Sequence, residues 1–278
     1  MKQIDQILKS KHNDRAFTLD VRWKISEYHK PAILFVHGFK GFKDWGPFNV
    51  MANYFAQAGF VFAKMNLSHN GTTVEHPLDF ADLEAFGHNN FSIELDDVEV
   101  AIDYLTTAAQ KIPIDASSIY LIGHSRGGGL VLLKAREDRR VKKVCTWAAV
   151  SDYVDFLSKN TDVEKWKTEG VKYIWNGRTK QDMPLYYQIF EDLQANLERF
   201  DILKAASELQ QPLLVVHGMD DETVRLKSAQ QIHAQKADSQ LFLVPEGTHT
   251  FGGYHPYDKT ELVEPLKAVV DKTISFFK

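Results

Sequence analysis

Residues 119–129 read Ile-Tyr-Leu-Ile-Gly-His-Ser-Arg-Gly-Gly-Gly, and they contain the strongest local pattern in the chain. A short apolar run leads into the pattern Gly123-x-Ser125-x-Gly127, and the helix-compatible residues 130–136 follow it. The pattern is typical of a sharp turn from a strand into a helix, in which a strained serine holds its hydroxyl clear of the sheet edge. The two glycines let neighbouring backbone pass without meeting a Cβ. We therefore expect the Ser125 hydroxyl to lie over a helix N-terminus, where backbone N–H groups favour an anion.

Composition and charge favour an ordinary globular protein. The 278 residues suffice for one large α/β domain, so a single domain over residues 1–278 is expected. The chain is 44% hydrophobic and 25% charged, and its net charge of −4 argues against nucleic-acid binding. The only cysteine, Cys145, excludes an internal disulfide and lies in an apolar run, where a core role is expected. No signal peptide or membrane span is visible, so a cytoplasmic protein without membrane contact is the expectation.

The apolar patterns predict a mostly parallel sheet with an antiparallel N-terminal edge. Apolar and polar residues alternate strictly from Phe17 to Ser26, which is typical of a half-buried antiparallel strand. Later strands are expected where apolar residues run almost continuously, at residues 32–39, 60–67, 118–124, 141–150, 212–217 and 240–244. Helix-compatible stretches follow them, at residues 48–57, 93–109, 130–136, 224–235 and 261–277. This alternation predicts an α/β layered fold with helices on both faces of the sheet.

The alternation breaks between residues 151 and 207, where no strong strand pattern is visible and aromatic residues mix with polar ones. An insertion at this point emerges at the carboxyl ends of the strands, where pockets of α/β proteins form. We therefore expect about residues 152–205 to form a helical cap insertion. Its aromatic side chains offer apolar contact area, and Trp175, Tyr186 and Tyr187 are the candidates for lining a substrate pocket. The alternative is an irregular helical excursion on the surface.

Two further strand ends carry residues that could act together with Ser125. A serine hydroxyl attacks as a nucleophile when a base accepts its proton, and the base needs an acid to orient it. One apolar run ends in His-Gly-Met-Asp-Asp-Glu-Thr-Val at residues 217–224, and the next is followed by Gly-Thr-His-Thr-Phe at residues 247–251. The order serine, acid, histidine along the chain is that of the α/β-hydrolase fold.

About residues 17–278 resemble the α/β-hydrolase superfamily, in its dienelactone-hydrolase, esterase and serine-peptidase-like branch. In that branch the acid commonly lies three positions before a valine in a turn that begins with His-Gly, which here is Asp221. The resemblance places the catalytic histidine in a Gly-x-His-x-Phe loop, which here gives His249. The alternatives that remain are Asp220 and Asp152 for the acid and His255 for the base.

The resemblance also implies two backbone N–H groups that would hold a developing oxyanion. One belongs to Arg126, directly after Ser125, and the other to Phe39 in the segment Val-His-Gly-Phe-Lys-Gly-Phe of residues 36–42. His37 is expected to support this loop by hydrogen bonding, and the Arg126 side chain to be solvated or salt-bridged. Structural roles are also expected for His124 and His217, whereas Lys40, Lys43 and Asp44 either touch a polar substrate or are solvated.

A metal site is not expected. The polar side chains that invite one are His69, His76, His88, Asp79, Asp82 and Glu84, and their spacing matches no standard zinc motif. The mechanism implied by the resemblance needs neither a metal nor an organic cofactor.

The sequence therefore predicts a serine hydrolase that cleaves a carboxylic ester through an acyl-enzyme on Ser125. The fold also hosts peptidases, amidases and acyl thioesterases, which are the alternatives within the class. A ligand-binding receptor that retains the triad and turns over slowly is the alternative from another class. The expected partner is a small-molecule acyl substrate, and the sequence leaves the oligomeric state open.

Overall fold

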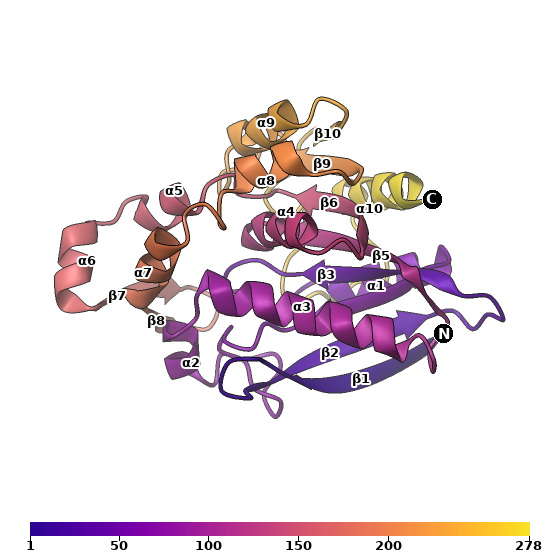
Figure 1. Cartoon of the computed structure of the whole chain (residues 1–278), viewed down its shortest axis with the longest axis horizontal. Coiled ribbons are helices and arrows are strands. Elements are labelled where there is room, and N and C mark those ends of the chain that lie inside the picture. Colours follow the sequence, from indigo (N-terminus) through magenta and orange to yellow (C-terminus); the bar gives the residue numbers. More distant parts are fainter.

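Eight strands form the central sheet of the protein, and the computed structural model describes all of residues 1–278 (Figure 1). The strands are β1 (Lys2–Lys9), β2 (Ala16–Trp23), β3 (Lys30–Val36), β4 (Val61–Met65), β5 (Ile114–His124), β6 (Val141–Trp147), β9 (Leu213–Gly218) and β10 (Gln240–Val244). Their order is β1-β2-β4-β3-β5-β6-β9-β10. β2 pairs antiparallel with both β1 and β4, and all remaining pairs are parallel. The predicted mostly parallel sheet with an antiparallel N-terminal edge is confirmed.

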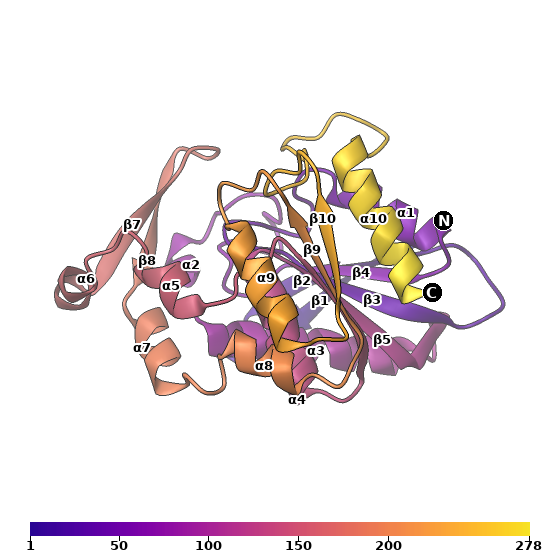
Figure 2. The ribbon, with the colours of Figure 1, turned by 90° about the horizontal axis from the view of Figure 1, so that it is seen from above.

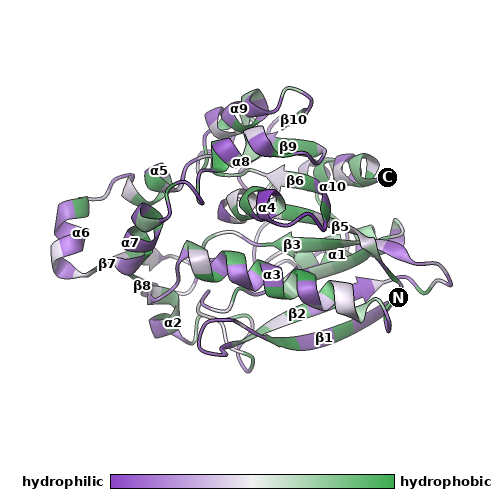
Figure 3. Cartoon of the chain, viewed as in Figure 1, coloured by the Kyte–Doolittle hydropathy of each residue, from purple (hydrophilic) through white to green (hydrophobic).

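Helices cover both faces of this sheet (Figure 2). On one face lie α1 (Phe48–Gln57) and α10 (Glu264–Phe277), and on the other α3 (Phe91–Ala108), α4 (Arg126–Glu137), α8 (Ile202–Glu208) and α9 (Leu226–Gln235). β3 explains why the central strands are continuously apolar: Ile33 and Phe35 pack toward α1, while Leu34 packs into the opposite core. In Figure 3 the central strands are coloured hydrophobic, as this double burial requires. No helix combines the length and the apolar character needed to cross a membrane.

Strand β1 was not predicted. Its apolar residues Ile4, Ile7 and Leu8 do not alternate, and Ile7 is 61% exposed. The strand forms because its backbone pairs along its whole length with β2, from Lys2 opposite Trp23 to Lys9 opposite Ala16. Backbone pairing with β2 thus makes β1 the edge strand despite its weak local pattern.

The segment between β6 and β9 extends from one end of the sheet (Figures 1 and 2). It consists of α5 (Tyr153–Ser158), α6 (Val163–Glu169), β7 (Val171–Asn176), β8 (Gln181–Tyr186), α7 (Gln188–Ala195) and α8. The expected helices are present, and the structure adds what the sequence analysis did not foresee, an antiparallel hairpin of β7 and β8. Its signal was present in the sequence: β-branched and aromatic residues lead from Val171 to Trp175, and the turn signal Asn176-Gly177 follows.

Candidate active site

Ser125 occupies the turn between β5 and α4 in a strained backbone conformation, with φ of 56° and ψ of −120°. Its N–H donates to the carbonyl of Trp147 at 2.8 Å, and its carbonyl accepts from the N–H of Gly128 at 3.0 Å. The first bond ties the turn to the end of β6, and the second begins α4. Neighbouring structure therefore holds the unfavourable conformation of the serine in place.

The glycines on either side of Ser125 are required by close backbone contacts. A Cβ on Gly123 would overlap the backbone of Gly127. A Cβ on Gly127 would come within 2.5 Å of the carbonyl oxygens of Val36 and His37. The Gly-x-Ser-x-Gly pattern thus allows α4 to begin directly against the end of β3.

Three polar side chains from three strand ends form one hydrogen-bonded chain. His249, in the loop after β10, has Nε2 at 3.0 Å from Ser125 Oγ and Nδ1 at 2.8 Å from Asp221 Oδ2. Asp221 lies in the loop after β9, and its other oxygen accepts the N–H groups of Thr223 at 2.8 Å and Val224 at 2.9 Å. With a carboxylate at Nδ1, His249 donates to Asp221 and leaves Nε2 free to accept from the Ser125 hydroxyl.

The environment of Asp221 keeps its carboxyl group ionised. Burial alone would raise its pKa, but the hydrogen bond and charge of His249 and the amides of Val224 and Thr223 outweigh burial. The net effect places the pKa of Asp221 below its usual range. The group is therefore a fixed negative charge behind the imidazole at neutral pH.

The competing residues take no part in this chain of hydrogen bonds. Asp220 is exposed next to Asp221. Asp152 caps α5 by accepting the N–H groups of Val154 and Asp155. His255 accepts the N–H of Gly46 through Nδ1 at 2.9 Å. The structure joins Ser125, Asp221 and His249 and leaves these three out of the chain, although His255 lines the cavity beside it.

The loop after β3 passes directly over Ser125. A Cβ on Gly38 would lie 2.8 Å from Ser125 Cβ and 3.4 Å from Ser125 Oγ. The peptide that joins Gly38 to Phe39 is therefore next to the serine, as expected for a donor in this loop. The other expected donor, the N–H of Arg126, belongs to the first residue of α4, where N–H groups have no partner within the helix.

His37 and Asn70 hold this loop in shape. His37 donates from Nδ1 to the carbonyl of Gly38 at 2.9 Å, and its Nε2 faces the N–H of Leu67 at 3.4 Å. The side-chain amide of Asn70 lies 3.3 Å from the same Nε2 and donates to the carbonyl of Gly41 at 3.2 Å. Burial lowers the pKa of His37 to about 4, so the ring is neutral, and it supports the loop as expected.

The Arg126 side chain also belongs to the framework of the site. It forms a buried ion pair with Glu94 of α3, and its guanidinium lies 4.8 Å from the centroid of the Phe39 ring. Glu94 in turn accepts from the side-chain amide of Asn89 at 2.7 Å. Arg126 therefore links both expected oxyanion donors to α3.

Two other charged residues of the loop after β3 are held in ion pairs within the protein. Lys43 and Asp44 join Asp20 of β2 and Lys64 of β4 in a buried cluster of ion pairs. Lys43 lies 3.0 Å from Asp20, and the Lys64 side chain is completely buried. Neither Lys43 nor Asp44 is free to contact a substrate, so of the three charged candidates in this loop only Lys40 remains.

The hydrogen-bonded chain opens into a cavity of about 380 Å³. Its lining combines the loop after β3, the turn at Ser125, the His249 loop and the tip of the β7–β8 hairpin. The lining residues are His37, Gly38, Phe39, Lys40, Gly41, Trp45, Phe48, His124, Ser125, Asn176, Arg178, His249, Thr250 and His255. The cap segment thus contributes to the cavity, but through Asn176 and Arg178.

The three aromatic residues expected in the pocket are not part of this lining. Trp175 is 57% exposed on the outer face of the hairpin. Tyr186 donates its hydroxyl to Glu84 at 2.5 Å. Tyr187 is buried against Trp166, with ring centroids 5.4 Å apart. Trp175 is directed away from the cavity because side chains alternate along β7, so that Trp175 and Asn176 point to opposite faces.

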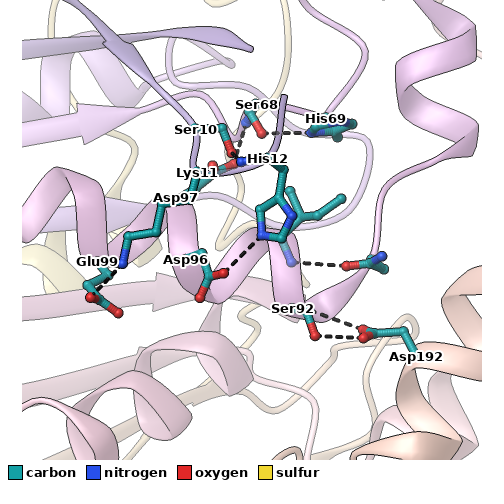
Figure 4. Close-up of polar contacts among 12 residues, drawn as sticks. Ser10, Lys11, His12, Ser68, His69, Ser92, Asp96, Asp97, Glu99 and Asp192 are labelled. Carbon is teal, nitrogen blue, oxygen red and sulfur yellow. Dashed lines mark hydrogen bonds and ion pairs between the residues drawn. The ribbon is translucent and has the colours of Figure 1, made fainter. Parts of the chain in front are cut away.

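The histidines and carboxylates of residues 69–88 do not converge on one point. His69 Nδ1 contacts Ser68 Oγ at 2.7 Å, and the N–H of Ser68 donates to Asp97 at 2.7 Å (Figure 4). His88 pairs with Glu84 on the surface of α2 (Leu83–Gly87). No three or more His, Cys, Asp or Glu side chains of the protein are grouped so that they could hold a metal ion.

Comparisons with known proteins agree on the fold. The BD-FAE family model matches residues 20–235. The sequence has no match among curated proteins. The structure of Est1E from Butyrivibrio proteoclasticus with ferulic acid bound has a TM-score of 0.72 at 18% identity, covering 98% of this chain and 97% of that one. A putative hydrolase from Agrobacterium vitis S4 has a TM-score of 0.74 at 16% identity, covering 100% and 99%. Dienelactone hydrolase from Anabaena variabilis ATCC 29413 has a TM-score of 0.64 at 16% identity, covering 100% and 98%.

At these identities the structural likenesses establish the α/β-hydrolase fold, and the family match extends over most of the chain. The protein belongs to the BD-FAE family and is a hydrolase of the α/β-hydrolase type.

Proposed function

We propose that the protein is a serine esterase that cleaves a small-molecule carboxylic ester through an acyl-enzyme on Ser125. The observation that carries this proposal is the chain of hydrogen bonds from Asp221 through His249 to Ser125 Oγ, at 2.8 and 3.0 Å, beside a cavity. These distances lie within the range in which a base can accept a hydroxyl proton.

In the first half of the reaction, Ser125 Oγ attacks the ester carbonyl carbon while His249 Nε2 accepts the hydroxyl proton. Asp221 stabilises the resulting imidazolium and holds its orientation. His249 then gives the proton to the alcohol oxygen, the carbon–oxygen bond of the ester breaks, and the acyl group stays on Ser125. Water repeats these steps in the second half, with His249 again as the base, and the acid is released.

The developing negative charge on the carbonyl oxygen needs fixed donors. The N–H groups of Phe39 and Arg126 are the proposed pair. The support for them is the packing of Gly38 against Ser125 and the position of Arg126 at the start of α4. Because the Arg126 side chain contacts the Phe39 ring, the two donors are held by a single packed unit.

The lining of the cavity favours an ester with a flat apolar part. Phe39, Trp45 and Phe48 place three aromatic rings along it. Ferulic acid, the ligand in the Est1E structure, is an aromatic acid, and membership of the BD-FAE family supports an ester substrate. Aryl and cinnamate-type esters are therefore the first compounds to test.

Labelling with a fluorophosphonate tests the nucleophile, and turnover of a substrate panel tests the bond that is cleaved. We expect covalent labelling at Ser125, loss of labelling in Ser125→Ala, and higher kcat/KM for methyl ferulate and p-nitrophenyl esters than for matched thioesters and anilides. Faster cleavage of the anilides would identify a peptidase or amidase, and faster cleavage of the thioesters a thioesterase. Saturable binding without turnover would identify a receptor.

A further inference from the structure

The cavity beside Ser125 is positively charged. Lys40 and Arg178 belong to its lining, and no aspartate or glutamate does. Asp79 acts on Arg178 only through its charge and lies outside this lining. Asp221, the carboxylate of the hydrogen-bonded chain, has a fully buried side chain behind His249. Its charge is directed at the imidazole and does not compensate the two cations.

Arg178 is placed at the cavity by the turn between β7 and β8. Its guanidinium lies over two buried rings, 5.0 Å from the centroid of Phe42 and 5.2 Å from that of Phe80. Within the chain, this guanidinium makes no hydrogen bond and has no carboxylate within 4.0 Å, and only its backbone N–H is bonded, to Asn176. Its side-chain donors are therefore available to a ligand.

Lys40 reaches the cavity from the opposite side, on the loop that follows β3. Its ammonium donates one hydrogen bond, to the carbonyl of Trp175 at 3.3 Å, and has no ion-pair partner in the chain. Since an ammonium has three N–H donors, two remain free. Lys40 and Arg178 thus bring unpaired positive charge from two separate elements to one space.

Buried cations elsewhere in the molecule are neutralised. Lys64 and Lys43 share Asp20 and Asp44, and Arg126 has Glu94. Where this chain uses a buried cation for its framework, it supplies a carboxylate. At the cavity, Lys40 is half-buried and Arg178 reaches solvent, and neither has an ion-pair partner. Burial lowers the pKa of both side chains, so each cation is partly desolvated.

We propose that the substrate carries a carboxylate that lies between Lys40 and Arg178 while its ester carbonyl lies at Ser125. Aromatic rings lie against one side of each cation and partly desolvate it, so a charge-assisted hydrogen bond there is stronger than one in bulk solvent. This inference rests on the proposed esterase function and narrows its substrate to anionic esters.

The test compares mono-p-nitrophenyl adipate with p-nitrophenyl hexanoate, which differ by a terminal carboxylate in place of a methyl group. The measured quantity is the ratio of kcat/KM for the anionic ester to that for the neutral one. We expect Arg178→Gln to lower this ratio by about ten- to a hundredfold, because it removes a charge-assisted hydrogen bond. Lys40→Gln is expected to lower it in the same direction, and Arg178→Lys to restore part of the preference.

Lys180→Gln is the matched control, because Lys180 belongs to the same turn but not to the cavity lining. It should leave the ratio as in the wild type, and an equal drop in this variant would reduce the effect to general surface charge and overturn the inference. A second pair, 4-carboxyphenyl acetate and 4-carbamoylphenyl acetate, places the charge on the leaving group. A drop in either pair supports the inference and shows which half of the ester carries the anion.

An unchanged ratio in both pairs for Arg178→Gln and Lys40→Gln overturns the inference. Fluorophosphonate labelling of Ser125 in each variant shows that the site has folded. If labelling and neutral-ester turnover persist while the anionic preference is absent, the esterase proposal stands and the anion site is rejected. If the wild type is neither labelled nor active, the esterase proposal itself has failed.

Discussion

The two walls of the cavity are built in different ways. One, here called the catalytic wall, consists of Gly38–Gly41, Ser125 and His249 and comes from loops at the ends of buried parallel strands. The other, the hairpin wall, consists of Asn176 and Arg178 at the tip of a two-stranded ribbon. Buried hydrogen bonds hold the loops of the catalytic wall in place, whereas the outer face of the hairpin is exposed to solvent.

The difference shows how this fold separates two tasks. Reacting groups must keep their geometry to a fraction of an ångström, so they belong on elements that cannot shift. Recognition of the remote part of a substrate tolerates adjustment, and an exposed ribbon can supply it. Substitutions in the two walls should therefore have effects of different size. Each prediction tests whether reaction and recognition are separated between the walls in this way.

The largest effect is expected on the catalytic wall at Ser125. Ser125→Ala removes the nucleophile and should lower kcat by about four to six orders of magnitude, because no other group can form the acyl-enzyme. Turnover of a p-nitrophenyl ester measures it, with the melting temperature as the control for folding. A variant that retains a few per cent of the activity, after contaminating esterases are excluded, would remove Ser125 from the mechanism.

Asp221→Asn is expected to cause the next largest loss of activity. The amide would take the place of a carboxylate that accepts from His249 and from two backbone N–H groups. We expect a loss in kcat of about three to four orders of magnitude, because the imidazole would lose its orientation and its counter-charge. Asp220→Asn, one residue earlier and exposed, is the control and should have little effect. The reverse result would exchange the roles of the two aspartates.

Glu94→Gln tests the support beneath the catalytic wall. It removes the charge that pairs with buried Arg126, so we expect the free energy of unfolding to fall by about 3–5 kcal/mol. Asp103→Asn, on the same helix and 51% exposed in its pair with Arg140, should lose at most about 1 kcal/mol. Urea unfolding measures both. Equal losses would mean that the buried pair adds nothing beyond a surface pair.

The free energy of unfolding should decrease progressively in acid, because of two buried histidines near the catalytic wall. Burial lowers the pKa of His37 to about 4 and that of His124 to about 3, against about 6.5 in an unfolded chain. Between pH 6.5 and 4 the unfolded chain therefore binds protons that the folded chain excludes. The free energy of unfolding should fall as pH decreases, by up to about 1.4 kcal/mol per pH unit for each histidine.

Asp97 has the opposite effect on the pH dependence of the free energy of unfolding. Its substitution therefore serves as a control. Burial raises its pKa to about 6, so in the same interval the folded chain binds a proton that the unfolded carboxylate does not. Asp97→Asn removes that offset, and its stability should decline more steeply with acid than that of the wild type. Urea unfolding at several pH values between 7 and 4.5 measures both slopes. A flat wild-type profile would contradict the assignment of neutral buried histidines.

The smallest effect is expected on the outer face of the hairpin. Trp175→Ala removes an exposed ring that does not line the cavity, while its carbonyl, which accepts from Lys40, remains. The free energy of unfolding should change by about 0.5 kcal/mol or less, and kcat/KM should stay close to the wild-type value. A large loss of activity would show that the outer face takes part in binding, and the two walls would no longer differ.

The sequence predicted well the strand ends that carry the proposed catalytic residues, because strong local patterns specify this part of the fold. Gly123, Ser125 and Gly127 fix the turn through close contacts that hardly any other residues permit. Apolar runs mark the buried strands, and polar residues directly after them mark the edge where Asp221 and His249 meet Ser125.

The hairpin wall was harder to predict, because its structure depends on contacts far along the chain. Gln181 of β8 donates to the carbonyl of Phe80, and Tyr186 bonds to Glu84, so the ribbon is placed by a distant loop and by α2. Nothing in the local sequence shows that Arg178 lies over Phe42 and Phe80. The aromatic content of the segment was visible, but the direction of each ring follows from the register of a hairpin that was not recognised.

The register of that hairpin has a practical consequence for protein engineering. Val171 and Tyr186 are directly paired, so the segment between them leaves and re-enters the molecule at one place. A ribbon of another length or sequence could be grafted between these two positions without changing the spacing of the strands that carry Ser125, Asp221 and His249. Libraries that keep buried Met183 and Leu185 and vary the turn, residues 177–180, would then change the recognition wall while the reaction centre stays constant. Such an exchange offers a route to new ester preferences within one scaffold.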